Sequence, residues 1–126
     1  MRNIFKKREV FKPFEYPKAE QFIKAVQSTF WIHDELKAEL DEDVQDYHNK
    51  FSETDKYIVS TILRTFADTE TAVLNDAWGV IGKYFPKAEF QGMGMTFAEN
   101  EFRHADAYFR INELLDLTEF EPYSAD

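Results

Sequence analysis

Two apolar stripes at helical spacing, separated by a break at Pro86, restrict this sequence more than any other feature. Over residues 52–84, apolar side chains recur three, four or seven residues apart, namely Ile58, Ile62, Phe66, Val73, Ala77 and Val80. Over residues 86–117, the second stripe consists of Phe90, Met93, Phe97, Ile111 and Leu115. Such spacing places side chains on one face of a helix, and no strand-like alternation persists. The sequence therefore predicts an all-α fold with two long helices.

Residues that begin and end helices fit these two segments. Ser52 precedes the first stripe and is a typical N-cap residue. Pro86 ends the first helix and can occupy the first turn of the next. Gly92 and Gly94 lie inside the second segment and make helix less certain near its start, while Pro122 interrupts the tail. If the chain turns back at Pro86, the two helices form an antiparallel hairpin.

The N-terminal part of the chain is less regular. Residues 1–16 mix charges, Phe and one Pro without a period, and we expect an extended arm. Pro17 suits the first turn of a helix, and we expect residues 17–50 to hold that short helix and an acidic stretch that is either a short helix or an irregular connector. The apolar stripe of the first short helix consists of Phe22, Val26 and Phe30. The length of residues 1–126 fits a single domain.

Composition excludes several classes of function. The net charge is −9, so a nucleic-acid backbone is not an expected partner. No apolar run reaches the ~18 residues that a membrane span requires, and no signal-peptide segment follows the basic N-terminus. The chain has no Cys, which fits a cytoplasmic protein and leaves only carboxylates and three His to hold a metal.

Polar residues interrupt both apolar stripes. Glu70 falls within the first, while Glu101, His104 and Tyr108 fall within the second, three and then four residues apart. A buried charge is costly unless it is paired or binds a metal. Glu70 and Glu101 are equally far from the break between residues 85 and 86, so at ~1.5 Å per residue both lie roughly 23 Å from the turn. The two carboxylates should therefore face each other across the hairpin, with His104 one turn further on.

A Glu that faces Glu-x-x-His on a neighbouring helix forms half of a carboxylate-bridged dinuclear metal site. The donor set suits iron or manganese, because hard carboxylates dominate and no thiolate is present. Spacing alone leaves other interpretations open. Glu101 and His104 could pair on the helix surface, and Glu70 could point to solvent. The sequence supports metal binding and these alternatives about equally.

Four further polar or aromatic residues need no function on spacing alone. Tyr108 taken by itself indicates a core aromatic residue, and Trp31 indicates a core anchor. His33 and His48 lie in the acidic stretch without a partner at ligand spacing. We therefore expect both of these histidines at the surface.

Five stretches, in order along the chain, resemble the N-terminal part of the small, radical-generating subunit of class I ribonucleotide reductase, of the phage and bacterial type. They are REVFKPFEYPKAEQF, STFWIHDEL, FADTETAVLND, ENEFRHADAY and INELLDL. The third matches the helix of the first metal carboxylate, and the fourth matches Glu-x-x-His followed by Tyr. The ordered set covers nearly all of the chain and is more specific than any one motif. The resemblance implies the N-terminal half of a ferritin-like helical bundle, and hence a partial domain.

The resemblance also implies a role for each candidate residue. Glu101 would be the bridging carboxylate of the first half-site, His104 its imidazole ligand, and Glu70 a further ligand where the family usually has Asp. Tyr108 would be the tyrosine that is oxidised to a radical, at a position where a related oxidase branch has Phe. Trp31 would relay an electron between the metal site and the large subunit, on a path that includes His104. The residues expected to shield the radical are Phe97, Phe102, Phe109 and Ile111.

The implied activity is that of ribonucleoside-diphosphate reductase, whose large catalytic subunit binds the substrate. The implied cofactor is dinuclear iron, with manganese or a mixed Mn/Fe centre as alternatives. Small subunits of this family are more than twice as long, so the remaining ligands would come from another chain. We expect a naturally split subunit, inactive alone, with a complementary C-terminal chain, in a dimer of small subunits in the cytoplasm, or the host cytoplasm if a phage encodes it. Without that complement, apolar helix faces would be exposed to water.

Two alternatives to a split subunit account for the short chain in different ways. The chain could be a truncated form or a gene remnant. It could instead be a self-contained ferritin-like protein that binds and oxidises iron, whose homodimer completes a symmetric di-iron site. Such a homodimer needs no relay through Trp31 and Tyr108, so the split reductase subunit is favoured. A purely structural helical module would leave Glu70, Glu101 and His104 unexplained.

Overall fold

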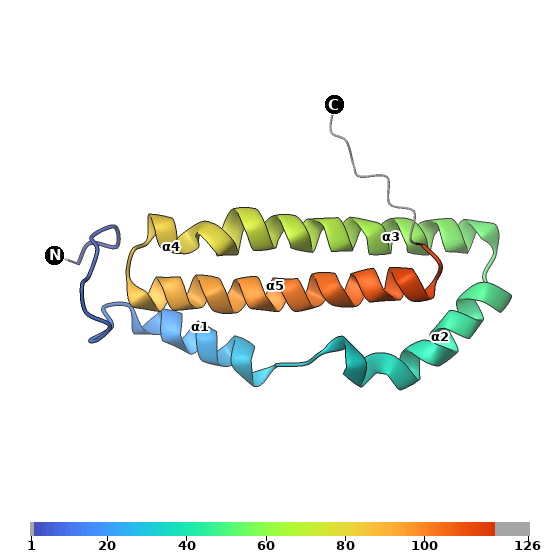
Figure 1. The fold of residues 1–126 in the computed structure, drawn as a ribbon, viewed down its shortest axis with the longest axis horizontal. Helices are drawn as coiled ribbons and strands as arrows, with labels where there is room; N and C mark the ends of the chain where they lie inside the picture. The colour runs from blue at the N-terminus through green and yellow to red at the C-terminus, as the bar shows by residue number, and fades with distance from the viewer. Residues whose placement is uncertain (1, 118–126) are drawn as a thin grey trace, which may run out of the picture.

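The computed structural model describes residues 2–117, in which all regular structure is helical. The two longest helices, α3 (Glu53–Ala72) and α5 (Ala88–Leu114), lie antiparallel and side by side (Figure 1). They confirm the predicted hairpin and the all-α fold, although α5 begins two residues after Pro86. The break expected at Pro122 lies outside the described residues.

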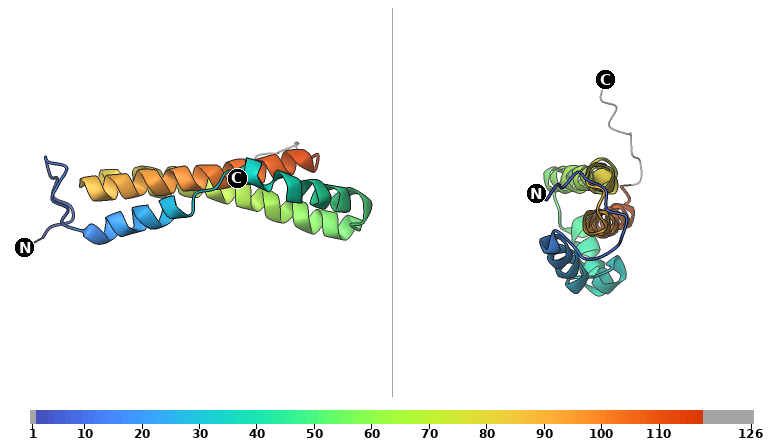
Figure 2. Two further views of the ribbon diagram at one scale, coloured as in Figure 1. Left: turned by 90° about the horizontal axis from the view of Figure 1, so that it is seen from below. Right: turned by 90° about the vertical axis from the view of Figure 1, so that its left-hand side faces the viewer.

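Two shorter helices lie on the side of α5 opposite α3 (Figure 1, Figure 2). The first, α1 (Pro17–Ser28), packs against the beginning of α5. A 3₁₀ turn, η1 (His33–Leu36), leads into α2 (Lys37–Asn49), which returns the chain to the start of α3. Seen end on, α5 lies between α3 on one side and the pair α1 and α2 on the other (Figure 2). The acidic stretch, for which a helix or an irregular connector was expected, is therefore mostly helical.

Ser52 caps α3 as predicted. Its Oγ accepts a hydrogen bond from the Asp55 backbone N–H at 3.2 Å, and the Asp55 carboxylate accepts one from the Ser52 backbone N–H at 3.1 Å. These two bonds satisfy N–H groups that the start of a helix leaves without partners. Pro17 occupies the first turn of α1, where the missing N–H of proline removes no intrahelical bond.

The segment predicted as one helix over 52–84 is helical throughout but changes type after α3. The change brings Trp78 onto Phe97 of α5, with ring centroids 4.6 Å apart. A π turn is wider than an α turn and a 3₁₀ turn is tighter, so this segment departs from a regular α-helix next to its contact with α5. The three elements that follow α3 are the π turn η2 (Val73–Ala77), the 3₁₀ turn η3 (Trp78–Val80) and the short helix α4 (Ile81–Tyr84).

Close packing between α5 and this segment explains Gly94. A Cβ atom at this position would lie 2.8 Å from the carbonyl oxygen of Trp78 and would collide with the side chain of Ile81. At Gly92, a Cβ atom would meet only Ile23, at 3.4 Å. Gly94 therefore allows a close helix approach, whereas Gly92 has room for a methyl group.

A buried group of charges fixes the N-terminal arm to the start of α5. Glu89 is 1% exposed and accepts hydrogen bonds from the Arg8 guanidinium and from the backbone N–H groups of Glu15 and Tyr16. Burial alone would raise the pKa of Glu89, but the hydrogen bonds from Arg8 and the backbone outweigh it and lower the pKa to about 2. Lys87 donates to the Glu15 carboxylate at 2.8 Å. The arm is therefore held in place by charges buried together.

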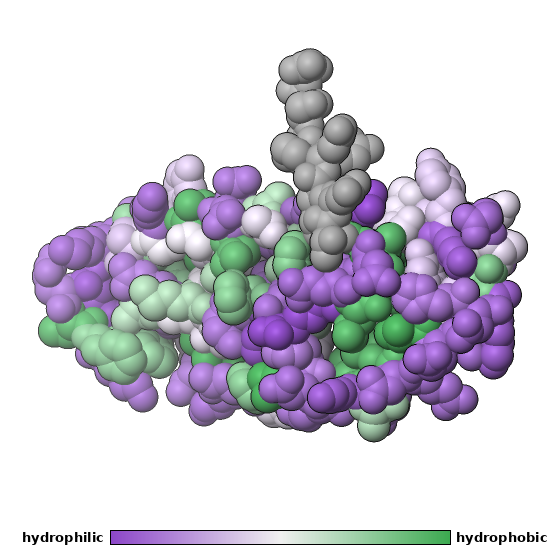
Figure 3. Space-filling model, turned by 45° about the vertical axis from the view of Figure 1, so that its right-hand side comes forward, coloured by the Kyte–Doolittle hydropathy of each residue, from purple (hydrophilic) through white to green (hydrophobic). Residues whose placement is uncertain are grey.

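Large apolar side chains remain open to water along α3. Ile58, Ile62 and Phe66 belong to the predicted stripe, yet each is 45 to 49% exposed. Figure 3 shows hydrophobic side chains gathered among hydrophilic ones on one face of the molecule. No helix within residues 2–117 has the length and apolar character that a membrane crossing requires. The hairpin covers only part of its apolar surface, as the sequence predicted. The buried hydrophobic side chains of the described part are Ala19, Tyr47, Ala67, Ala107 and Leu115.

Candidate metal centre

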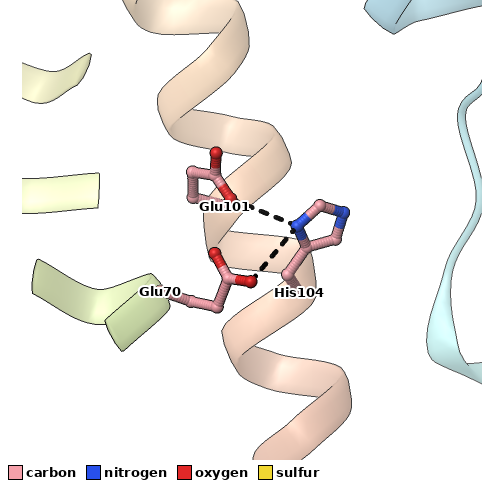
Figure 4. Close-up of side chains that lie close together, drawn as sticks. All are labelled: Glu70, Glu101 and His104. Carbon is pink, nitrogen blue, oxygen red and sulfur yellow. Dashed lines mark hydrogen bonds and ion pairs between the residues drawn. The ribbon is translucent and has the colours of Figure 1, made fainter. Parts of the chain in front are cut away.

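Two helices bring two carboxylates and one imidazole together. Glu101 and His104 lie three residues apart on α5, and therefore on one face of the helix, while Glu70 reaches them from α3 (Figure 4). One potential ligand atom from each of the three side chains lies within 4.8 Å of the other two. The predicted meeting of Glu70 and Glu101 across the hairpin is confirmed.

The Nδ1 atom of His104 faces both carboxylates. It lies 3.1 Å from Oε2 of Glu101 and 3.8 Å from Oε1 of Glu70, while the other ring nitrogen points away (Figure 4). The three side chains are 15 to 28% exposed. The alternative in which Glu70 points into solvent is therefore wrong, because its carboxylate turns towards α5.

The electrostatics of the cluster fit a bound cation. Burial raises the pKa of Glu70 to about 7, and the hydrogen bond and the charge interaction with Glu101 act in the same direction. The carboxyl groups of Glu70 and Glu101, whose oxygens lie within 4.8 Å of each other, share a proton or require a cation between them. Two carboxylates and one imidazole form a donor set that suits iron or manganese. The residues present therefore fit a metal ion, which would take the place of the shared proton.

The described chain offers one such cluster. Within residues 2–117, no other group of three His, Asp or Glu side chains brings its potential ligand atoms so close together. A dinuclear site of the helical-bundle type needs a further Glu and a second Glu-x-x-His pair. The cluster of Glu70, Glu101 and His104 contains the residue types of one Glu and one Glu-x-x-His pair.

The two aromatic residues singled out in the sequence lie next to the cluster. The Trp31 indole stacks on the His104 imidazole, with ring centroids 5.7 Å apart and planes inclined by 20°. Tyr108 follows His104 by about one helical turn, and its ring contacts Phe66 of α3 at a centroid distance of 5.3 Å. The structure therefore brings all five predicted site residues into one region, while their roles remain predictions.

The residues expected to surround Tyr108 do so only in part. Phe102 and Phe109 are 59% and 43% exposed, and Phe97 stacks instead on the indole of η3. Each residue turns a helix by about 100°, so the side chains directly after Glu101 and Tyr108 point away from α3. A ring that does contact the phenol comes from Phe66, a member of the α3 stripe. In this chain alone, Phe102 and Phe109 do not shield the phenol.

Two contacts near Trp31 leave little sign in the sequence. Arg103 is 8% exposed and donates a hydrogen bond to the Trp31 carbonyl oxygen at 2.8 Å. His33 Nδ1 lies 3.1 Å from Oδ2 of Asp106, and its side chain is only 23% exposed. His33 is therefore half-buried rather than the surface residue that was expected, whereas His48 is exposed as expected. The only sequence signal for Arg103 is its place directly before the candidate imidazole ligand.

A family model and individual relatives both identify similar proteins as small chains of ribonucleotide reductase. A family model described as "Ribonucleotide reductase, small chain" matches residues 8–123. The chain is 31% identical over 112 residues to a probable ribonucleoside-diphosphate reductase small subunit of Invertebrate iridescent virus 3, covering 87% of this chain and 28% of that protein. A corresponding probable small subunit of Invertebrate iridescent virus 6 is 26% identical over 117 residues, covering 93% of this chain and 32% of that protein.

A yeast protein extends the comparison beyond viruses. The ribonucleoside-diphosphate reductase small chain of Schizosaccharomyces pombe is 33% identical over 66 residues, which cover 52% of this chain and 16% of the relative. The chain spans about a third or less of the length of the curated relatives it matches. Its helices are consistent with part of a ferritin-like helical bundle. Because the family match extends over nearly the whole sequence, the chain belongs to the ribonucleotide reductase small chain family.

Proposed function

We propose that this chain supplies half of a dinuclear metal site and the radical-bearing tyrosine of a ribonucleoside-diphosphate reductase small subunit. One observation carries the proposal, namely the convergence of Glu70, Glu101 and His104 from two antiparallel helices. In helical-bundle metal proteins, a Glu facing a Glu-x-x-His pair is half of the site, and two further helices provide the rest. Membership of the small chain family supports the same assignment.

Each residue of the cluster has its own part in holding the metal. Glu101 would bridge the two ions, and His104 would bind one of them through Nδ1. Glu70, whose pKa is raised to about 7, would bind in its deprotonated form. Iron is the expected metal, with manganese or a mixed Mn/Fe centre as alternatives, because carboxylate oxygens and imidazole suit all of these. When bound, the metal pair supplies one-electron oxidising power.

Tyr108 and Trp31 are the residues that we assign to electron transfer. Tyr108 lies about one turn beyond His104, where its phenol would give up one electron and one proton to become the radical. Trp31 is half-buried and stacks on the His104 ring. An electron can therefore pass between the cluster and the surface through two rings in contact. We propose this route for exchange with a large catalytic subunit, which would bind and reduce the nucleotide.

The second half of the site would come from a complementary chain. Relatives are about three times as long as this chain, and the matches cover only 28% and 32% of two of them. The half-exposed Ile58, Ile62 and Phe66 would provide apolar surface for such an association. The completed unit would act in the cytoplasm as a dimer of small subunits, bound to the large subunit.

The test is reconstitution with a complementary chain that contains a second Glu-x-x-His pair. Mixing the two chains with ferrous iron and oxygen should give about two metals per pair and the electron paramagnetic resonance signal of a tyrosyl radical. Tyr108→Phe should remove the radical signal while the metal content stays the same. Tyr57→Phe is the matched control, because Tyr57 lies on α3 and is 71% exposed. Its radical signal should equal that of the unaltered pair.

Two results would contradict the proposal. A radical that persists in Tyr108→Phe would refute the assignment of the tyrosine. Failure of the mixed chains to bind more metal than either chain alone would refute the shared dinuclear site.

A homodimer is the second candidate, because the same exposed apolar face could bind a second copy of this chain. Each copy would then contribute one cluster to a symmetric di-iron site, and the protein would bind and oxidise iron without a large subunit. In that case the chain alone should form a dimer with about two metals and should consume oxygen. The stacking of Trp31 on His104 has no use in such a protein, so we favour the split reductase subunit.

A further inference from the structure

Trp31 lies in a connector that has no regular secondary structure of its own. Residues 30–32 join α1 to η1, and Trp31 is only half-buried there. A side chain on such a segment keeps one position only if contacts with another element hold it. The flat stacking of the indole on His104, inclined by 20°, therefore requires anchors outside the connector.

Arg103 provides the first anchor. Its Nη1 atom donates to the Trp31 carbonyl oxygen at 2.8 Å, and its guanidinium lies over the Phe30 ring, 4.4 Å from the centroid. Two further nitrogen atoms of the guanidinium donate to side chains of α5, namely Nε to Glu99 at 2.7 Å and Nη2 to Asn100 at 3.1 Å. Glu99 and Asn100 thus orient the planar guanidinium, so that one side chain contacts both the ring and the backbone of the connector.

His33 and Asp106 provide the second anchor. His33 Nδ1 lies 3.1 Å from Oδ2 of Asp106. His33 begins η1, two residues after Trp31, and Asp106 lies on α5, two residues after His104. Arg103 directly precedes His104 on the same helix. The two anchors therefore attach the connector and the start of η1 to residues just before and just after His104 on α5.

We infer that Arg103 is a positioning residue that holds Trp31 in stacking contact with His104. Arg103 is not itself one of the candidate metal ligands, and it acts on the backbone of Trp31 and on the neighbouring ring of Phe30. The use of this stack for electron transfer rests on the proposed function. The positioning itself does not, because it can be measured in the metal-free chain.

The test uses the two tryptophans of the full chain as separate fluorescent reporters. Trp78→Phe leaves Trp31 as the only tryptophan, and Trp31→Phe leaves Trp78, which packs on Phe97 away from the connector. Arg103→Lys is introduced into both backgrounds, because lysine keeps the charge and suits a helix but lacks the planar fork. The observable is quenching by acrylamide, which reports how accessible each indole is.

Arg103→Lys should make Trp31 more accessible without changing Trp78. Loss of a hydrogen bond from a charged donor corresponds to a shift of about tenfold in the equilibrium between docked and released connector. Quenching of Trp31 should rise accordingly, and the ellipticity at 222 nm should not change. Lys24→Arg, the reverse exchange, is the control, because the Lys24 side chain lies on α1, is 70% exposed and pairs with Glu20 of its own helix rather than with either anchor. It should leave both reporters unchanged.

Either of two outcomes would overturn the inference. Unchanged quenching of Trp31 in Arg103→Lys would show that the stack does not depend on Arg103. An equal rise for Trp31 and Trp78 would show that the substitution loosens the whole fold. A failure to form a tyrosyl radical in the reconstituted pair would contradict the proposed function but would leave the quenching result standing.

Discussion

Replacing Glu70 with Gln should stabilise the metal-free chain at pH 8 much more than at pH 5. In the folded chain, burial and the nearby Glu101 raise the pKa of Glu70 from 4.5 to about 7. A carboxyl group whose pKa is raised by folding favours the folded state fully only below its unfolded pKa, and that contribution is lost as the pH rises through about 7. At pH 8 the two carboxylates repel each other, and Gln removes one of the charges.

The size of the effect follows from the pKa shift. A change from 4.5 to about 7 corresponds to roughly 3 kcal/mol at most. The Glu70 side chain is 22% exposed, and solvent screens part of this repulsion. We therefore expect Glu70→Gln to raise the free energy of unfolding by about 1–2 kcal/mol at pH 8 and by less than about 0.5 kcal/mol at pH 5.

Urea unfolding followed by circular dichroism, with a chelator present, measures both values. Asp68→Asn is the matched control, because Asp68 is an exposed carboxylate on the same helix, and its substitution should change stability by less than about 0.5 kcal/mol at either pH. With saturating metal, the original chain should be more stable than Glu70→Gln, since an ion at 100 times its dissociation constant stabilises the chain that binds it by about 2.7 kcal/mol. An equal gain at pH 5 and pH 8, or no gain at pH 8, would refute repulsion between Glu70 and Glu101.

Four further substitutions test the packing and the buried polar groups of α5. In thermal denaturation, Gly94→Ala should cost about 1–3 kcal/mol by overpacking, whereas Gly92→Ala should be neutral or stabilising by up to about 1 kcal/mol; equal effects would contradict the close approach at Gly94. Asn112 is fully buried and its amide has no hydrogen-bond partner within the described chain, so Asn112→Leu should not lower stability in urea, since an unpaired amide costs about 1–3 kcal/mol. Glu89→Gln should be less stable than the original chain above pH 4.5, and in an acid titration the difference should shrink as the pH falls towards about 2; a constant difference would contradict the lowered pKa of Glu89.

Helix periodicity and helix-end signals predicted the hairpin because both depend on local sequence. Ser52 and Pro17 mark helix starts because the first N–H groups of a helix have no partner within the helix. Ser52 accepts a hydrogen bond from one of them, and Pro17 has no N–H group. The equal distances of Glu70 and Glu101 from the turn remained a good guide even though the helix changes type after α3. The wider π turn and the tighter 3₁₀ turn alter the length of the segment in opposite directions, so the two carboxylates still meet.

Contacts between distant parts of the chain could not be predicted in the same way. Arg103 and Trp31 are 72 residues apart, and Arg8 and Glu89 are 81 apart. Such pairs leave no periodic signal, because either partner alone reads as an ordinary charged or aromatic residue. The short chain predicted that some apolar surface would be exposed, but spacing alone could not show that Phe66 would be part of it.

The contacts that hold α5 allow the cluster of Glu70, Glu101 and His104 to form within this chain alone. Glu89 is clamped by the arm at the start of the helix, and Arg103 fixes the connector beside His104. Side chains such as Phe66 and Phe102 remain exposed close to the cluster. A metal site works only when its ligands are held within about half an ångström of the required geometry. A small subunit divided between its two half-sites could therefore assemble by docking apolar faces, without refolding the helices that carry Glu101 and His104.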